Sequence, residues 1–337
     1  MTLPPPGMSV AGAFFWLVPH HFWSAALQEV VSIMLASGRT ALELSLYLLL
    51  PVMVIMLALM QALEARGILA RIARLLAPAL RPFGIPGSGV FAMLQVLLVS
   101  FAAPIATLNL QDRDGTHQRH IAATLAMVLA MPQANVLFPM AAAGMNLGAV
   151  VAISLVGGLA AASLTFYGLT RHFDTGQPGA AAVAKSNSRD RRSLWAIMVG
   201  GGQEGVQIVL NAIPALILAI FAVNLLKTIG AIGLLEQALT PGLELIGLPA
   251  AAVLPMATKY LAGGTAMMGV TLDLVKQGTL TMAEFNRLAG FLITPLDMVG
   301  VSVLCTAGPR VAGIARPAVI GGLVGILVRG ILHLLVF

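Results

Sequence analysis

Charged residues are scarce in this chain of 337 residues. Asp, Glu, Lys and Arg together make up 9% of the sequence, whereas 58% of the residues are hydrophobic and the mean hydropathy is +0.94. Soluble domains carry about 25% charged residues. The shortage of charge therefore excludes a soluble globular protein and predicts an integral membrane protein.

Side chains that bind metals or form cross-links are also few. Cys305 is the only cysteine, which excludes a disulfide framework and a thiolate metal cluster. The histidines have no acidic or cysteine partner at the spacing of metal ligands, and the acidic residues are too scattered for a di-iron or EF-hand site. Because no phosphate loop and no motif of an intramembrane enzyme is present, we expect no metal, no cofactor and no enzymatic activity.

Several apolar stretches are long enough to cross a hydrocarbon core of about 30 Å, which takes roughly 20 residues. These are 41–62, 90–110, 145–169 and 207–226. Residues 171–193 are polar, rich in turn formers and free of apolar periodicity, which is typical of a linker. The net charge of +6 suits Lys and Arg retained in cytoplasmic loops and does not indicate a nucleic-acid partner. We expect an all-α polytopic membrane protein.

The two halves of the chain are related in sequence. When 201–306 is moved back by 163 positions onto 38–143, residues that break helices fall into register: Gly38 with Gly201, Pro51 with Pro214, Gly67 with Gly230, and Pro132 with Pro295. Backbone geometry fixes Gly and Pro, so generic apolar composition does not explain this agreement. Duplicated units with interrupted apolar helices are typical of secondary transporters, in which a solute site lies between the copies.

The duplication divides the chain into four parts. Residues 1–37 are an interfacial helix or an extra transmembrane helix, 38–170 the first repeat, 171–193 a cytoplasmic linker, and 194–337 the second repeat. Each repeat is expected to contain an amphipathic interfacial helix, at 66–80 and at 231–245.

The distribution of Lys and Arg leaves two topologies open. Thirteen of the 19 basic residues lie in 63–86, 171–193, 273–289 and 308–316. If 120–144 and 284–307 are re-entrant hairpins that turn near Pro132 and Pro295, each repeat crosses three times, the repeats are inverted, and the basic segments share the cytoplasmic side. If both segments span, the repeats are parallel and the linker lies opposite the basic helix at 66–80. The positive-inside rule favours inverted repeats with broken or re-entrant helices.

Polar groups inside the apolar segments are candidates for a solute site, because a charge at membrane depth costs roughly 2.5–3.5 kcal/mol on insertion scales. Lys259 has a natural counter-ion in Asp297, just past Pro295, and the first repeat offers neutral amides near the aligned positions. Interrupted helices add free backbone amides and carbonyls. The expected solute-binding residues are Gln95, Gln133, Asn135, Thr258, Lys259 and Asp297.

Structural roles are the alternative explanation for these polar residues. Lys259 and Asp297 could form a structural ion pair that closes the bundle, and Lys259 could instead snorkel to an interface. The aligned Gln61 and Asn224 are explained more simply by hydrogen bonds between helices. The small residues of 321–325 suit either internal packing or the seam of a homodimer.

A pattern of Gly, Leu and Pro occurs in both repeats. It stands as Gly67…Leu76-Ala-Pro78-Ala-Leu80…Gly84-Ile-Pro86 and as Gly230…Leu239-Thr-Pro241-Gly-Leu243…Gly247-Leu-Pro249. The pattern resembles the gate, or nucleoside-recognition, domain shared by concentrative nucleoside transporters, the membrane part of the ferrous-iron transporter FeoB and the spore maturation membrane proteins. The resemblance covers about 40–165 and 203–330. It implies a bacterial inner-membrane protein with two gate units.

The expected function is movement of a small polar solute, nucleoside-like if the resemblance extends to the substrate, by alternating access between the two repeats. A proton or a sodium ion would be the coupling ion. The alternative is a membrane scaffold or accessory subunit of a larger complex that transports nothing, as the spore-protein branch of the resemblance permits.

Overall fold

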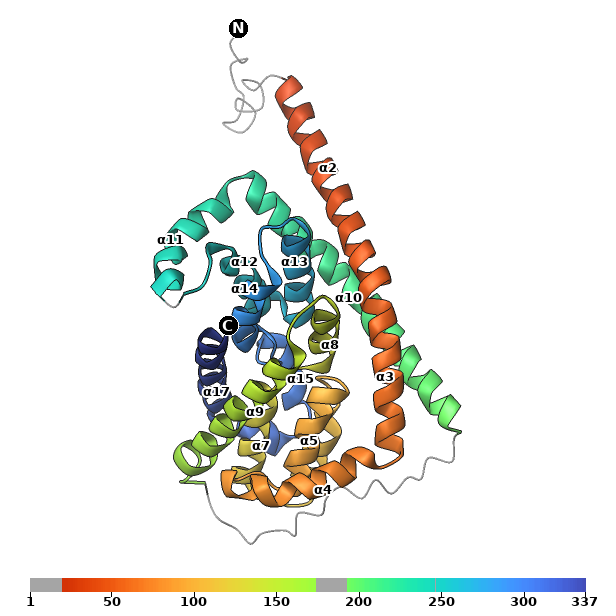
Figure 1. Cartoon of the computed structure of the whole chain (residues 1–337), viewed down its shortest axis with the longest axis vertical. Coiled ribbons are helices and arrows are strands. Elements are labelled where there is room, and N and C mark those ends of the chain that lie inside the picture. Colours follow the sequence, from red (N-terminus) through yellow and green to blue (C-terminus); the bar gives the residue numbers. More distant parts are fainter. Residues whose placement is uncertain (1–19, 174–192, 246) are drawn as a thin grey trace, which may run out of the picture.

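The computed structural model describes residues 20–173, 193–245 and 247–337, and every regular element in these ranges is a helix (Figure 1). The first half contains α2 (His20–Glu43), η1 (Leu44–Leu49), α3 (Leu50–Ala65), α4 (Ile68–Leu80), η2 (Arg81–Phe83), α5 (Gly87–Leu98), α6 (Pro104–Arg113), α7 (Gln118–Ala130), α8 (Ala134–Ala142), α9 (Leu147–Ser163) and η3 (Leu164–Leu169). The second half contains α10 (Leu194–Thr228), α11 (Ala231–Leu245), η4 (Ala250–Ala252), α12 (Val253–Ala262), α13 (Gly264–Lys276), α14 (Met282–Leu292), α15 (Met298–Cys305), α16 (Pro309–Gly313) and α17 (Ala315–Val336). The expected all-α fold is confirmed.

Within the described ranges, five stretches of helix are long and apolar enough to cross a membrane. They are Leu27–Ala65, Gln118–Ala142, Leu147–Leu169, Leu194–Thr228 and Ala315–Val336. The chain is therefore a multi-pass membrane protein.

The first stretch is one continuous rod made of α2, η1 and α3 (Figure 1). The break expected near Pro51 is a π-helical turn, Leu44–Leu49, which lets the rod continue although Pro51 has no N–H to donate. The boundary expected between residues 37 and 38 lies inside α2, and residues 1–19 of that first segment lie outside the described part of the chain. The rod packs along α10, where Gln61 donates a hydrogen bond to Glu204 and Asn224 donates one to Ser37 at 3.0 Å.

The segments expected to be re-entrant hairpins at 120–144 and 284–307 are instead broken helices that cross. The start of α7 lies beside η3, where the rings of His120 and Phe166 are in contact with their centroids 4.8 Å apart, whereas α8 ends just before α9 begins. The pair α7–α8 therefore runs the whole length of α9–η3 in the opposite direction. In the same way α14 starts beside the end of α17, where Asn286 contacts His333, and α15 ends shortly before α17 begins.

Re-entrant hairpins do occur, in the two segments just before the broken helices. In α5–α6, which was expected to be a span at 90–110, Gln111 near the end donates to Ser88 near the start at 2.9 Å, and Thr107 donates to Gln95 at 2.7 Å. In α12–α13 the chain reverses at Gly263, whose φ of 89° is left-handed and suits a residue without a side chain. The prediction placed the hairpins wrongly because Pro132 and Pro295 interrupt the helical hydrogen bonds without reversing the chain.

The two halves repeat the same order of elements at the predicted shift. The ends of α3 and α10 correspond, as do α4 with α11, α5–α6 with α12–α13, and α7–α8 with α14–α15. Gly67 and its counterpart Gly230 both have left-handed φ angles, of 67° and 75°. α4 and α11 lie at opposite ends of the molecule (Figure 1). The inverted arrangement of the two repeats stays a prediction.

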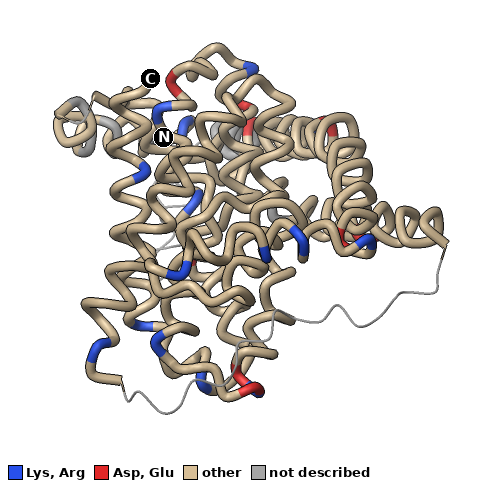
Figure 2. Tube along the Cα trace, turned by 60° about the horizontal axis from the view of Figure 1, so that its bottom comes forward, with Lys and Arg blue, Asp and Glu red and all other residues tan. Residues whose placement is uncertain are grey.

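Charged residues are spread thinly over the molecule (Figure 2), and by their positions in the chain more of the basic ones belong to the end that holds α4. Hydrogen bonds connect the segments at this end of the molecule. Tyr167 donates to the carbonyl of Pro82, Arg119 to that of Phe166, and Arg310 to that of Thr116. Among the described residues it holds Arg66, Arg71, Arg74, Arg81, Arg113, Arg119, Arg171, Arg310 and Arg316, whereas the opposite end holds Arg39, Lys227, Lys276 and Arg287. Most of the linker 171–193, with four further basic residues, lies outside the described ranges.

The halves are held together by α17, which packs on α7, α9 and α14. Glycine makes the contact with α9 close: a methyl group on Gly157 would lie 2.6 Å from the carbonyl oxygen of Gly325. The small residues of 321–325 are thus used inside the molecule, and the homodimer stays a prediction.

Candidate functional site

Lys259 and Asp297 form a buried ion pair at the centre of the second half. Lys259 lies in the last turn of α12 and is 0% exposed, and Asp297 precedes α15 and is 8% exposed. The ammonium donates to Asp297 Oδ2, while Asp297 Oδ1 accepts the N–H of Gly300 at 2.7 Å and so caps α15. The pairing expected from the sequence is present, and Lys259 does not snorkel to an interface.

Gln133 joins the first half to this pair. It precedes α8, at the break between α7 and α8, and its amide lies directly against Gly264 at the start of α13, where a side chain on Gly264 would collide with it. Gly263, at the tip of the same hairpin, lies close to Asp297, since a methyl group there would be 3.9 Å from Oδ2. The tip of one hairpin therefore touches the breaks of both crossing helices.

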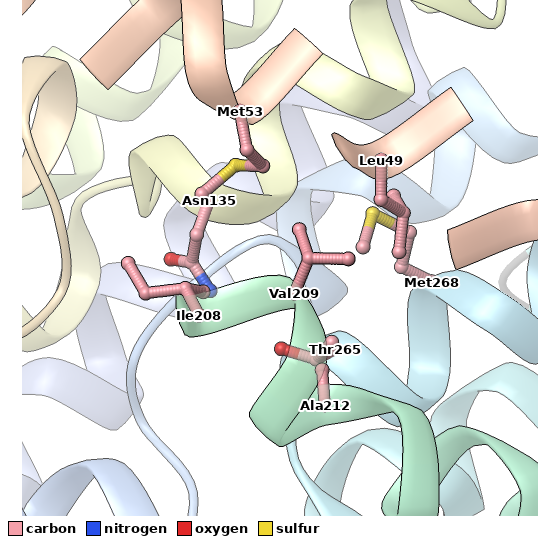
Figure 3. Close-up of a pocket in the computed structure, with 8 residues that line it drawn as sticks. All are labelled: Leu49, Met53, Asn135, Ile208, Val209, Ala212, Thr265 and Met268. Atoms are coloured by element: carbon pink, nitrogen blue, oxygen red, sulfur yellow. The ribbon is translucent and has the colours of Figure 1, made fainter. Parts of the chain in front are cut away.

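Asn135 lines a small pocket next to these residues (Figure 3). Thr265 of α13 lies on the same pocket, whose remaining lining is apolar and comes from Leu49, Met53, Ile208, Val209, Ala212 and Met268. The centre of a water molecule can reach about 10 Å³ of this pocket, so the pocket holds roughly one water. The Asn135 side chain is buried, and its Oδ1 has no hydrogen-bond partner among the described residues.

Gln95 and Thr258 use their polar atoms elsewhere. Gln95 donates to Glu64 Oε1 at 3.2 Å and accepts from Thr107, so it links the first hairpin to α3. Thr258 donates to the carbonyl of Leu254 within its own helix at 2.8 Å. The structure therefore brings together Gln133, Asn135, Lys259 and Asp297 around the tip of the second hairpin. Solute binding by these four residues, and by Gln95 and Thr258, stays a prediction.

Arg329 of α17 is a central residue that was not among the predicted site residues. It is 0% exposed, and its guanidinium donates to the carbonyl oxygens of Ala130 and Ile293, the latter at 3.2 Å. Ala130 ends α7 and Ile293 follows α14, so one cation satisfies the C-terminal ends of both broken helices. A lone Arg within the apolar run of 318–332 was the available signal, because such a charge must find buried acceptors.

The chain matches known proteins in sequence and in fold. Residues 46–165 match the family model described as Gate: Nucleoside recognition. Spore maturation protein B of Bacillus subtilis (strain 168) is 36% identical over 77 residues, which are 23% of this chain and 43% of that protein. The match thus spans less than half of that relative.

Solved structures of the concentrative nucleoside transporter CNTnw share the fold. The inward-facing substrate-bound state is 16% identical with a TM-score of 0.65 and covers 95% of this chain and 87% of that one. An outward-facing double variant is 15% identical, also with a TM-score of 0.65, and covers 95% and 86%. The resemblance expected from the Gly and Pro pattern is confirmed for the first half: residues 46–165 match the gate, or nucleoside-recognition, family model, and the chain has the fold of the CNTnw structures. The second gate unit, expected at about 203–330, stays a prediction.

Proposed function

We propose that this protein transports a small polar solute across the membrane by alternating access, with the solute bound between the hairpin α12–α13 and the breaks of the two crossing helices. The observation that carries the proposal is the meeting of Gln133, Lys259 and Asp297 at that hairpin tip. Burying these groups in a membrane protein is costly, and ionisable residues within membrane segments are typical of functional sites.

The chain has elements suited to alternating access. A hairpin that enters from one side can withdraw without breaking a transmembrane helix, and Gly263 and Gly264 supply a flexible tip. The helix pair formed by α3 and α10 packs through glycine: a methyl group on Gly205 would lie 2.9 Å from the carbonyl oxygen of Met53. This tight pair is suited to be the fixed part against which the hairpins move. The fold is shared with CNTnw structures in outward-facing and inward-facing states.

We infer from the positive-inside rule that the α4 end faces the cytoplasm together with the linker. Location in a bacterial inner membrane is part of the same proposal. Coupling to a proton or a sodium ion, and the nucleoside-like nature of the solute, belong to the same proposal.

The test is uptake into proteoliposomes, with purified protein and radiolabelled nucleosides, nucleobases, amino acids and organic acids. We expect one of these classes of compound to accumulate in the proteoliposomes. This uptake should be lost in the double variant Lys259→Met, Asp297→Asn. Uptake that is equal in the double variant and in wild type would place the solute elsewhere.

A scaffold or accessory role is the second candidate. It is favoured by the closed ion pair and by a pocket with room for about one water, and the match to a spore maturation protein is compatible with it. In that case no member of the panel would be taken up or would raise the melting temperature, because a ligand stabilises the folded state to which it binds.

A further inference from the structure

Three helices begin at the centre of the molecule, and two of them lack a negative group at their N-terminus. Neither α8, which begins at Ala134, nor α13, which begins at Gly264, has a side-chain cap, whereas α15 is capped by Asp297. The first N–H groups of a helix have no partner inside it, and they carry a partial positive charge that favours anions.

One residue from the first turn of each uncapped helix lines the same pocket. Asn135 is the second residue of α8 and Thr265 the second residue of α13, and both line the cavity of Figure 3. Gln133, just before α8, lies against Gly264, so the two helix starts are in direct contact. A single bound group can therefore face both.

The negative helix ends at this centre already have cations. Arg329 donates to the carbonyl oxygens of Ala130 and Ile293, which close α7 and α14, and Lys259 lies in the last turn of α12. The described charged groups at the centre are thus two cations and one carboxylate, Asp297. One of these two cations, Arg329, has no carboxylate partner among the described residues.

Asn135 supplies an independent sign of a missing ligand. Its side chain is 6% exposed, and Oδ1 has no hydrogen-bond partner among the described residues. A buried polar group without a partner is costly. An amide can also rotate to present its N–H donors, so it can adapt to an acceptor.

We propose that the solute carries an acidic group, a carboxylate or a phosphate, which binds between the N-termini of α8 and α13 beside Lys259. That the bound anion is a transported solute rests on the proposed function, whereas the anion site itself does not. In the absence of solute, Asp297 satisfies the ammonium of Lys259.

The test is chemical rescue of Asp297→Asn. Asn keeps the cap of α15 but leaves Lys259 without a carboxylate, so the melting temperature should fall. Sodium formate should restore most of the loss relative to equal sodium gluconate, whereas formamide should restore none. The control is Asp112→Asn, which removes a carboxylate outside the pocket that accepts a hydrogen bond from the backbone N–H of Arg310 at 3.2 Å. Formate should not raise the melting temperature of this variant. Sodium phosphate in a parallel arm tells a carboxylate site from a phosphate site.

Absence of rescue by formate and by phosphate would overturn the anion site. If Asp297→Asn does not fold, bromide diffused into crystals of the wild type decides the matter. Anomalous density between Asn135 and Thr265 supports the site, and density at surface arginines alone overturns it. Uptake of nicotinamide but not of nicotinate would leave the transport function standing and refute an acidic solute.

Discussion

The guanidinium of Arg329 lies 3.2 Å from the carbonyl oxygen of Ile293, and its other amino group binds the carbonyl of Ala130. These two carbonyls belong to the two halves of the chain, at the aligned breaks of their crossing helices. A single cation thereby holds both breaks at one level of the molecule, beside the Lys259–Asp297 pair.

Replacement of Arg329 by Met should destabilise the protein strongly. Two buried carbonyl oxygens would lose their donors, at about 1–3 kcal/mol each. Thermal unfolding in detergent measures the effect. Arg316→Met, at an exposed position in the first turn of the same helix, is the control and should unfold close to wild type. Equal melting temperatures of the two variants would contradict the role of Arg329.

Single and double substitutions at the ion pair should not be additive. Lys259→Met and Asp297→Asn each leave one buried charge alone, which costs about 3–5 kcal/mol, whereas the double variant leaves none. The double variant should therefore melt above either single variant. Losses that simply add would argue that the two side chains act independently.

A small residue is required where α9 meets α17. Gly157→Ala would bring a methyl group against Arg329 and to 2.6 Å from the carbonyl oxygen of Gly325, and we expect a loss of about 1–3 kcal/mol from overpacking. Gly233→Ala in α11 is the matched control, since a methyl group there meets nothing within 4 Å. The control should be neutral or slightly stabilising, because Ala favours helix over Gly.

The two amphipathic helices should be accessible from opposite sides of the membrane. In a Cys305→Ala background, Arg81→Cys at the end of α4 should react with a membrane-impermeant maleimide only when the cytoplasmic side is open. Leu245→Cys at the end of α11, where the native side chain is 89% exposed, should react in intact cells. Labelling of both from the same side would rule out inverted repeats.

The sequence identified the membrane class and the central ion pair, and it predicted the duplication. Charge and hydropathy are sums over residues and need no three-dimensional information, and the shared spacing of Gly67 and Gly230 reflects local backbone geometry. Lys259 and Asp297 were paired correctly because an isolated charge in an apolar segment requires a partner of opposite sign.

Only the tertiary structure decided which segments turn back and which cross. A proline interrupts helical hydrogen bonds in the same way in a hairpin and in a broken transmembrane helix. The choice depends on which neighbours satisfy the freed backbone, here Arg329 for Ala130 and Ile293, and these contacts join residues about 36 and 199 positions apart. The sequence thus determined that buried charges exist, and packing determined that they meet at the tip of the second hairpin.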